Sequence, residues 1–414
     1  NPASATDPVT LQVLGRVGPA SGDAVFINGA GNSQVTVEST GVVASTLHVN
    51  SAGSATITNR GALGSGTGAA VFLESGNNNT LTLDTGTVLN GNVQSGTATG
   101  NAVVLTGSAS TSADFVGSSA GNGFGSITMQ GTNWTLGGNE TITGTAADAL
   151  NVASGTLTLT GTATNSGSTT IANGATLQLG SNTASGMVTG NIIDNGTLTF
   201  NRSDNVTYAN VVSGTGKLTQ AGPGTLILTG DNAHTGGTTI SAGTLQLGDG
   251  GATGSVIGDI ENNSALVINR SNSVTLPRVI SGSGTLTQAG TGTTILAGAN
   301  TYTGATTVNA GALWVNGSTA SATTTVASGA TIGGTGTIGG SVAVNDGGRF
   351  APGNSPGTLT IAGNLAFAPT SQLDYEFGQA NVPGGPLNDL LTLGGNLTLD
   401  GTINVSVGPG GNLL

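Results

Sequence analysis

The chain has 414 residues with 74 glycines, only 6 % charged side chains and a net charge of −12. Seven Lys and Arg cannot supply the cationic surface of a nucleic-acid binder, and a chain without cysteine cannot hold disulfides or a cysteine-ligated metal. Because Val, Ile and Thr are abundant between Gly and Asn residues, the composition predicts a β-rich chain with many turns rather than a disordered one.

The N-terminal region, residues 1–150, opens on the polar segment 1–10, and no apolar run reaches the roughly 18 residues of a membrane span. We expect either a cytosolic protein or an exported one whose signal peptide has been removed, and the lack of cysteine favours export. Residues 22–38 (GDAVFINGAGNSQVTVE) resemble residues 68–84 (GAAVFLESGNNNTLTLD), so this region is predicted to consist of coils with loose repeats.

The middle region, residues 151–350, contains long internal repeats. Residues 190–202 (GNIIDNGTLTFNR) return as 258–270 (GDIENNSALVINR), and the offset of 68 continues from 211–247 to 279–315. Each copy holds short alternating runs between turn residues, which are stable only when stacked on one another. Since a repeat of this length divides into about three coils of 22–23, we predict an all-β, right-handed parallel β-helix, a solenoid with three short strands per coil.

The C-terminal region, residues 351–414, is predicted to contain the last coils and an irregular cap. Its prolines are too frequent for uninterrupted central strands. They are Pro352, Pro356, Pro369, Pro383, Pro386 and Pro409.

Two segments carry a resemblance to a known family. Residues 211–247 and 279–315, which include SGSGTLTQAGTGTTILAGANTYTGATTVNAGAL, resemble the autotransporter-associated β-strand repeat of bacterial type V secretion passengers. Residues 347–365 (GGRFAPGNSPGTLTIAGNL) are similar to the PGNSPGTL segment near the C-terminal part of many such passengers. The resemblance covers roughly residues 150–405.

This resemblance implies an exported β-helix displayed at the cell surface. A C-terminal translocator barrel and a signal peptide would then be missing from this sequence, and the region near residue 352 would act as a folding nucleus. The protease branch of the family carries a GDSGS motif and the esterase branch a GDS block near its N-terminus. Neither occurs here, which leaves the non-enzymatic adhesin branch.

Two short motifs that match catalytic patterns are expected by chance in so glycine-rich a chain. Residues 117–121 fit G-x-S-x-G and residues 334–339 fit the dinucleotide fingerprint, but no helix is predicted after either one. Acidic residues fall in successive turns at Asp231, Asp249, Asp259 and Glu261, yet nothing singles out the carboxylate pair that a glycosidase needs. We therefore expect no cofactor, no metal and no catalytic residues.

Four residues are candidates for binding on an exposed face. Asn165, His234 and Tyr302 occupy one position of successive repeat copies, which is typical of a variable, solvated corner. Trp314 alternates with buried positions and replaces Gln246 of the preceding copy, so it either faces outward as a binding residue or packs in an end coil.

Other polar positions are expected to have local roles. His48 lies between Leu47 and Val49 and is predicted to face outward from a strand. Arg202 and Arg270 sit at equivalent repeat positions and are expected to make local pairs.

The sequence leaves three functional hypotheses. The first is an adhesive passenger that binds copies of itself on neighbouring cells, giving autoaggregation and biofilm, or binds a host surface protein or glycan. The second is a polysaccharide-binding or polysaccharide-cleaving β-helix, which needs acids that converge in a groove. The third is an inert stalk. No nucleic acid is expected as a partner, and a membrane only through the missing barrel.

Overall fold

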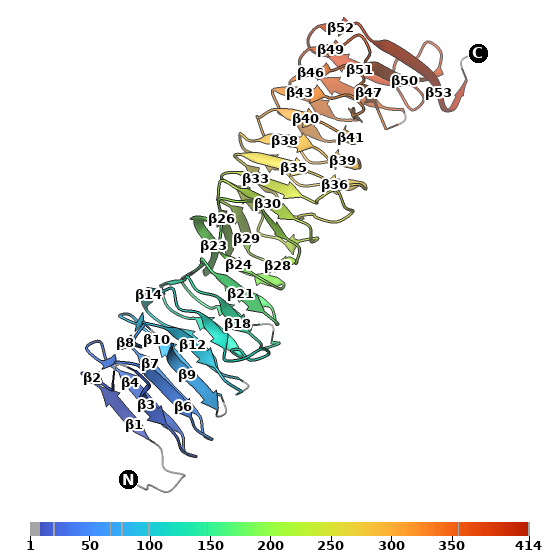
Figure 1. The fold of residues 1–414 in the computed structure, drawn as a ribbon. Coiled ribbons are helices and arrows are strands. Elements are labelled where there is room, and N and C mark those ends of the chain that lie inside the picture. Colours follow the sequence, from blue (N-terminus) through green and yellow to red (C-terminus); the bar gives the residue numbers. More distant parts are fainter. Residues whose placement is uncertain are drawn as a thin grey trace. The chain divides into compact units, whose positions relative to one another are not determined.

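The computed structural model describes residues 9–19, 21–66, 68–75, 78–97, 100–146, 148–354 and 356–412. Throughout these ranges the regular structure is β-strand, and no helix in them has the length and apolarity of a membrane crossing. The strands stack in parallel, turn upon turn (Figure 1), which confirms the predicted parallel β-solenoid. The first part of segment 1–10 and Ser355 of the PGNSPGTL string lie outside the described residues.

The chain forms two compact units. Unit 1 comprises Asn1–Ser203 and Asn210–Lys217, and unit 2 comprises Asp204–Ala209 and Leu218–Leu414. The division into regions 1–150, 151–350 and 351–414 stays a prediction.

Unit 1 has three sides per turn. The first side is one sheet of parallel strands: β1 (Thr10–Val13), β4 (Ser33–Val37), β7 (Ala55–Asn59), β10 (Thr80–Leu83), β13 (Ala102–Leu105), β16 (Ser126–Met129), β19 (Leu150–Val152), β22 (Thr169–Ile171), β25 (Ile192–Asp194) and β28 (Val212–Gly214). The second side is two sheets: β2 (Arg16–Val17), β5 (Val42–Val43), β8 (Ala62–Leu63) and β11 (Val88–Leu89), then β14 (Ser108–Thr111), β17 (Asn133–Leu136), β20 (Thr156–Leu159), β23 (Thr176–Thr183) and β26 (Thr197–Arg202). The third side is β3 (Asp23–Ile27), β6 (Thr46–Asn50), β9 (Ala69–Ser75), β12 (Asn92–Ser95), β15 (Phe115–Gly117), β18 (Glu140–Ile142), β21 (Thr162–Asn165) and β24 (Met187–Val188).

Unit 2 follows the same plan. One side is β27 (Val206–Tyr208), β30 (Thr225–Leu228), β33 (Thr244–Leu247), β35 (Ala265–Ile268), β38 (Thr285–Gln288), β40 (Thr306–Val308), β43 (Thr323–Val326), β46 (Ser341–Val344), β49 (Leu365–Phe367) and β52 (Leu397–Leu399). The next is a seven-stranded sheet of β36 (Val274–Leu276), β39 (Thr293–Leu296), β41 (Ala312–Val315), β44 (Thr331–Gly334), β47 (Arg349–Pro352), β50 (Gln372–Gln379) and β53 (Thr402–Asn412). The short strand β31 (Ala233–His234) precedes these strands in the chain and is not part of their sheet. The last is β29 (Lys217–Gln220), β32 (Thr238–Ile240), β34 (Ile260–Asn262) and β37 (Ile280–Ser281), then β42 (Ser318–Thr319), β45 (Thr337–Ile338), β48 (Thr358–Ile361) and β51 (Leu390–Leu393).

The core of each unit lies inside the turns and follows the period-two alternation of the strands. In β30, Leu226 and Leu228 are fully buried while Thr225 and Ile227 face outward. Leu226 pairs with Leu245 on the next turn, so like side chains stack at the roughly 4.8 Å spacing of neighbouring strands. This stacking buries a continuous apolar column that no single turn could form.

The sequence repeat is not a whole number of turns. On one side of unit 2, Thr225 pairs with Thr244, Thr244 with Ala265 and Ala265 with Thr285, so three turns carry the chain only as far as Thr285. The repeat equivalent of Thr225 is Thr293, which lies in β39 on the neighbouring side. The coil length expected from the repeat is therefore wrong for these turns. Each 68-residue repeat covers three complete turns, which are shorter than the expected 22–23 residues, and then continues along one more side of the solenoid. Equivalent residues of successive copies therefore lie on neighbouring sides.

The last described strands of unit 2 leave apolar side chains in contact with solvent. Ile403 pairs with the buried Leu373 and so points inward, yet it is 47 % exposed because no described strand stacks on β53. Leu397 and Leu399 of β52 are similarly exposed. The folding-nucleus role expected for this region stays a prediction.

Candidate functional site

The predicted line of exposed side chains is buried. Asn165 is 7 % exposed, and His234 and Tyr302 are 0 % exposed. Each binds the hydroxyl of a threonine four positions further along the chain. The contacts are Asn165 Nδ2 to Thr169 Oγ1 at 3.3 Å, His234 Nε2 to Thr238 Oγ1 at 2.9 Å and the Tyr302 hydroxyl to Thr306 Oγ1 at 2.7 Å. The three residues thus form one repeated internal contact.

The cause of this error is a polar segment in which buried and exposed side chains alternate as they do in a strand. Asn300 and Tyr302 are buried while Thr301 is exposed, and the same alternation holds for Asn232, Ala233 and His234. The side chain at position 302 therefore points inward, where its polar atom needs a hydrogen-bond partner. The expectation of an exposed corner is therefore wrong for these residues. Asn165 still lines a surface hollow of unit 1, and a binding role for this position stays a prediction.

Trp314 faces outward and is half-buried. It pairs with Gly333 on the next turn, where an added Cβ would lie 2.5 Å from Trp314 Cζ3. The indole therefore lies over the glycine of the neighbouring strand. This contact explains its partial exposure, and a binding role for Trp314 stays a prediction.

Arg202 and Arg270 make the same contacts in their two copies. Arg202 donates from Nη1 to the Gly186 carbonyl at 2.8 Å and from Nη2 to the Ala184 carbonyl at 2.7 Å. Arg270 donates in the same way to Gly254 at 2.9 Å and to Ala252 at 2.5 Å. Both arginines hold closed a short loop between neighbouring strands, a structural role.

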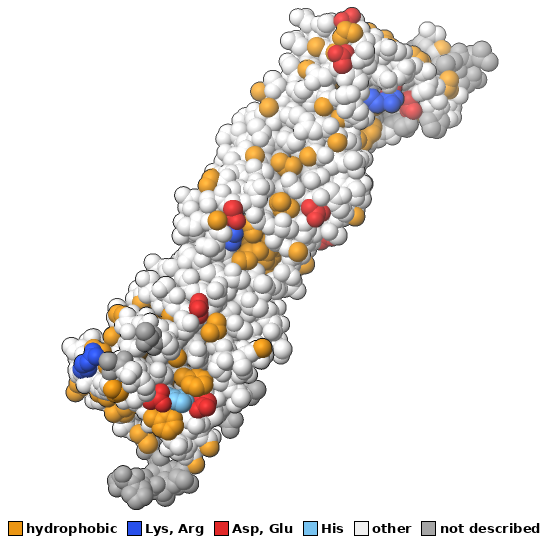
Figure 2. Space-filling model, viewed as in Figure 1, with side chains coloured by type: hydrophobic (Ala, Val, Ile, Leu, Met, Phe, Trp, Pro, Cys, Tyr) orange, Lys and Arg blue, Asp and Glu red, His pale blue; other side chains and the backbone are white. Residues whose placement is uncertain are grey.

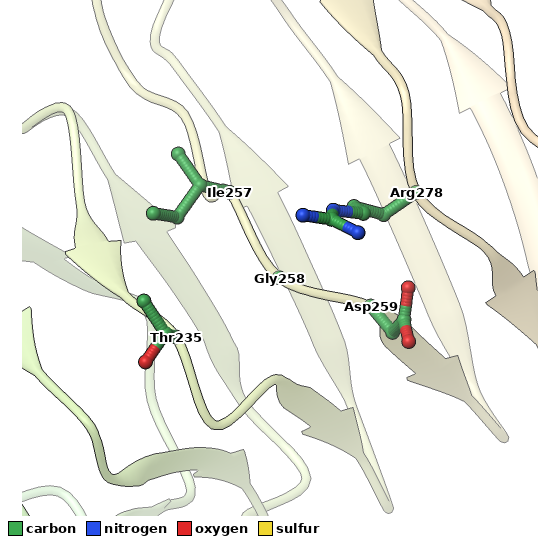
Figure 3. A pocket seen from close by; sticks show the side chains of 5 residues that line it. All are labelled: Thr235, Ile257, Gly258, Asp259 and Arg278. Carbon is green, nitrogen blue, oxygen red and sulfur yellow. The ribbon is translucent and has the colours of Figure 1, made fainter.

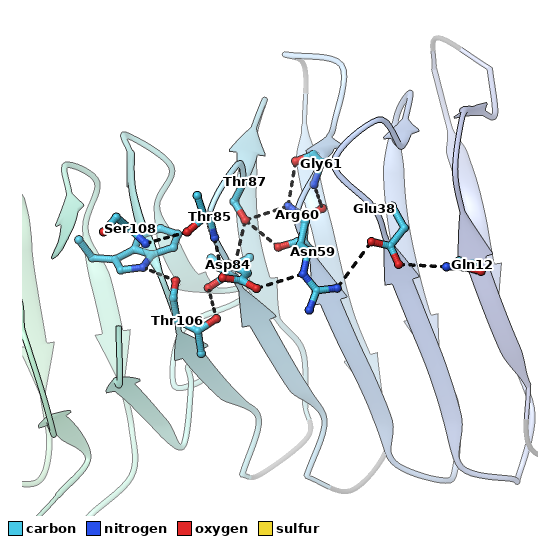
Figure 4. Close-up of polar contacts among 12 residues, drawn as sticks. Gln12, Glu38, Asn59, Arg60, Gly61, Asp84, Thr85, Thr87, Thr106 and Ser108 are labelled. Carbon is cyan, nitrogen blue, oxygen red and sulfur yellow. Dashed lines mark hydrogen bonds and ion pairs between the residues drawn. The ribbon is translucent and has the colours of Figure 1, made fainter. Parts of the chain in front are cut away.

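A second group of charged side chains forms a ladder on the first side of unit 1 (Figure 4). Arg60 Nε lies 3.1 Å from Asp84 Oδ2, and Arg60 Nη1 lies 3.7 Å from Glu38 Oε2. Glu38 also accepts a hydrogen bond from Gln12 Nε2 at 3.0 Å. The backbone N–H of Thr85 and the Arg60 guanidinium lower the pKa of Asp84 below its usual value. These charges pair across turns and form a solvated face.

The third side of unit 1 carries an unusual cluster of aromatic and titratable side chains. His48 Nδ1 lies 2.9 Å from Asp23 Oδ2, and His48 Nε2 lies 2.8 Å from Glu74 Oε2. The imidazole packs between Phe26 and Phe72, with ring centroids 4.9 and 4.8 Å away. The outward orientation predicted for His48 is confirmed, but the clustering was missed because its members belong to three different turns of the chain.

Two buried carboxyl groups were also missed. Among the described residues neither oxygen of Glu140 has a hydrogen-bond partner, and burial raises the pKa of this group to about 8. Asp194 accepts a hydrogen bond from the backbone N–H of Gly196 at 3.0 Å, while no described residue bonds to its Oδ2, and burial raises the pKa of Asp194 to about 6. Both side chains point into the interior of the solenoid. They therefore affect the stability of the fold and cannot reach a substrate.

Two surface hollows in the described part of the chain show what the surface offers a ligand. In unit 2 a hollow of about 210 Å³ is lined by Thr235, Ile257, Gly258, Asp259 and Arg278, and Figure 3 shows the guanidinium extending over Gly258. Asp259 accepts the backbone N–H of Val279 at 3.0 Å. In unit 1 a hollow of about 360 Å³ is lined only by Asn, Ser, Thr and Gly. Neither hollow has the paired acids of a glycosidase.

The two short motifs that match catalytic patterns by chance have no catalytic surroundings among the described residues. Ser119 of the G-x-S-x-G match is exposed in a turn, and its Oγ accepts a hydrogen bond from Asn122 Nδ2 at 2.9 Å. Residues 334–339 run from the end of β44 into β45, with no helix N-terminus for a phosphate. Across the described ranges no three His, Asp or Glu side chains gather as metal ligands would.

Comparison with known proteins relates this chain to autotransporters. Residues 154–179, 218–247 and 286–315 match the family described as passenger-associated-transport-repeat. The chain is also similar to the adhesin BmaC autotransporter of Brucella suis biovar 1 (strain 1330), at 37 % identity over 189 residues. This similarity covers 44 % of the chain but only 5 % of the length of that relative. The resemblance to autotransporter passengers of the adhesin type is thereby confirmed.

Proposed function

We propose, on the premise that this chain carries the repeats of autotransporter passengers, that it acts as part of a surface-displayed adhesin. It would hold bacteria to one another, as in autoaggregation and biofilm, or to a host surface protein or glycan. The similarity to a protein named as an adhesin autotransporter carries this proposal.

The chemistry of the surface supports an adhesive role. Outward-facing strand positions are mostly Thr, Ser, Asn and Gln, and charged groups are few, as the white surface of Figure 2 illustrates. Such a face offers many weak hydrogen bonds with little repulsion between like charges. Many weak contacts on one displayed chain add up when two cells meet, because the contacts after the first are intramolecular.

The same observations favour a non-enzymatic role. The mapped hollows lack the carboxylate pair of a glycosidase, and the buried Glu140 and Asp194 are beyond the reach of a substrate. No observation favours the polysaccharide-cleaving alternative.

The experiment is display of residues 1–414 on a non-aggregating bacterium through an unrelated translocator barrel. The proposal expects faster settling of the cells or greater retention on host cells than for bacteria that display the barrel alone. Equal settling and equal retention, with display verified by antibody, would refute it. Settling without retention would assign the chain to self-association, and the converse to host attachment.

A further inference from the structure

The cluster around His48 departs from the rest of the molecule in composition. The chain has eight phenylalanines, and five of them are at most 3 % exposed, namely Phe115, Phe124, Phe200, Phe350 and Phe367. Phe26 is 51 % exposed and Phe72 is half-buried, and both face outward from strands of one sheet. Figure 2 shows a histidine between acidic and apolar side chains on an otherwise mostly uncharged surface. Exposed aromatic side chains grouped with charges mark interaction sites more often than they mark cores.

The register of the strands makes this group a ladder. Phe26 pairs with His48 across β3 and β6, and His48 pairs with Phe72 across β6 and β9. The His48 ring is nearly parallel to that of Phe72, at 24°, and is edge-on to Phe26, at 69°. Because β3 is the first strand of its sheet, no described strand of that sheet covers the outer side of Phe26.

The two carboxylates fix the ladder and remain open to a ligand. Asp23 and Glu74 each use one carboxylate oxygen on a ring nitrogen of His48. Their side chains are still 40 % and 41 % exposed, and among the described residues the second oxygen of each has no hydrogen-bond partner. Two free acceptor oxygens therefore flank the His48 imidazole, which packs against the exposed Phe26 ring, and the two carboxylates make the cluster negative.

We propose that this acidic-aromatic cluster, formed by Asp23, Phe26, His48, Phe72 and Glu74, binds a cationic side chain of a partner protein. A guanidinium or ammonium group can lie against the exposed Phe26 ring and donate to the free oxygen of Asp23 or of Glu74. Charge complementarity selects this partner, because the cluster is negative and the chain has a net charge of −12. An arginine fits better than a lysine, since its planar group can stack on the ring and donate twice.

This inference rests on the proposed adhesive function and names the chemistry of one partner contact. It places that contact on the third side of unit 1, over β3, β6 and β9. A sulfated or carboxylated glycan would be repelled there, and a neutral sugar is the competing ligand for an aromatic platform with carboxylates.

The experiment is calorimetric titration of the full chain with a capped Gly-Arg-Gly-Arg-Gly peptide at low ionic strength, and with its lysine counterpart. The test variants are Phe26→Ser and the double variant Asp23→Asn, Glu74→Gln. The matched control is the double variant Asp249→Asn, Glu261→Gln, which removes the same charge from exposed positions in unit 2. Thermal unfolding of each variant checks that the turns remain folded.

We expect the double variant in the cluster to weaken peptide binding at least tenfold and Phe26→Ser at least threefold. The control should change binding less than twofold, and the lysine peptide should bind about threefold more weakly than the arginine peptide. No measurable binding to the unmodified chain, or equal losses in the cluster and the control, would overturn the inference. Tighter binding of neutral oligosaccharides that depends on Phe26 would overturn it as well.

This outcome is separable from that of the adhesion assay. In one outcome the cells adhere through the chain while the cluster variants change neither adhesion nor peptide binding. That result would refute the inference and leave the adhesive function intact. Peptide binding by the cluster in a chain that gives no adhesion would refute the function alone.

Discussion

Replacing Asp194 by asparagine should stabilise the protein at neutral pH. The repeat supplies the natural precedent, because Asn262 occupies the equivalent position at the repeat offset of 68. Asn262 Oδ1 accepts the backbone N–H of Ser264 at 3.2 Å, and Nδ2 donates to the carbonyl of Thr285 at 2.8 Å. Asp194 keeps the first contact through Gly196, but its Oδ2 has no hydrogen-bond partner in the described part of the chain. The amide introduced by the substitution would supply the missing donor.

The size of the effect depends on pH in a defined direction. Burial raises the pKa of Asp194 from 3.8 to about 6, so the folded state favours the protonated carboxyl. The stability that this protonation contributes is complete below pH 3.8 and is lost as the pH rises through 6. A pKa raised by this much corresponds to about 3 kcal/mol, which we reduce to about 2 kcal/mol for solvent screening. We expect Asp194→Asn to add about 2 kcal/mol at pH 7.5 and almost nothing at pH 3.5.

The assay is urea unfolding followed by circular dichroism, together with hydrogen exchange of the turns around residue 194, at pH 3.5, 5.5 and 7.5. Hydrogen exchange is needed because a stacked solenoid can open locally. The reverse substitution Asn262→Asp should cost about 2 kcal/mol at pH 7.5, and Asn309→Asp at an exposed position is the control. The reasoning fails if Asp194→Asn destabilises at pH 7.5, or if its gain does not shrink on acidification.

Three further predictions concern the interior. The pKa of Glu140 is raised from 4.5 to about 8, so the stability that its protonation contributes is lost as the pH rises through 8. Glu140→Gln should therefore raise the free energy of urea unfolding by about 2–4 kcal/mol at pH 8 and leave it unchanged at pH 4. An equal effect at both pH values would contradict this cause. Tyr302→Phe removes the contact with Thr306 and should cost about 1 kcal/mol in urea unfolding, whereas no loss would mean that the contact is dispensable. Arg270→Met removes the donors of two loop carbonyls and should lower the free energy of unfolding by about 2–4 kcal/mol, with at least tenfold faster hydrogen exchange in residues 248–254. The control Arg349→Met, at an exposed position, should lower it by less than about 1 kcal/mol. Equal losses for the two substitutions would refute the loop-closing role of Arg270.

The fold was predictable because the repeat and the alternation agree. Short runs such as residues 225–228 alternate with period two and recur at the offset of 68, and a stacked solenoid satisfies both patterns. The length of a turn was not predictable from the period. A repeat of three turns and one further side has the same sequence signature as a repeat of three longer turns, so the strand register was needed to separate them.

The candidate site was less accessible to sequence reasoning. Variation at Asn165, His234 and Tyr302 suggested an exposed corner, yet the interior accepts all three side chains because a threonine four positions on supplies the partner. The sequence signal that would have placed Tyr302 inside is the alternation of buried and exposed positions that starts at residue 300. If Asn300 points inward, Tyr302, two positions later, points inward as well.

The cluster around His48 had no local signal at all. Its members lie on three successive turns, and only the register of β3, β6 and β9 brings them together. Loose similarity between residues 22–38 and 68–84 places Phe26 and Phe72 at equivalent positions, which is the nearest sequence indication of the pair.

The adhesive function is tested most directly by the force between surfaces that carry the purified chain. Beads coated with residues 1–414 are brought against surfaces coated with the same chain, against host cells, and against a surface coated with an unrelated protein of similar net charge. An adhesin requires a rupture force well above that of the unrelated coating on at least one of the first two surfaces. A force equal to that of the unrelated coating on both would contradict the account.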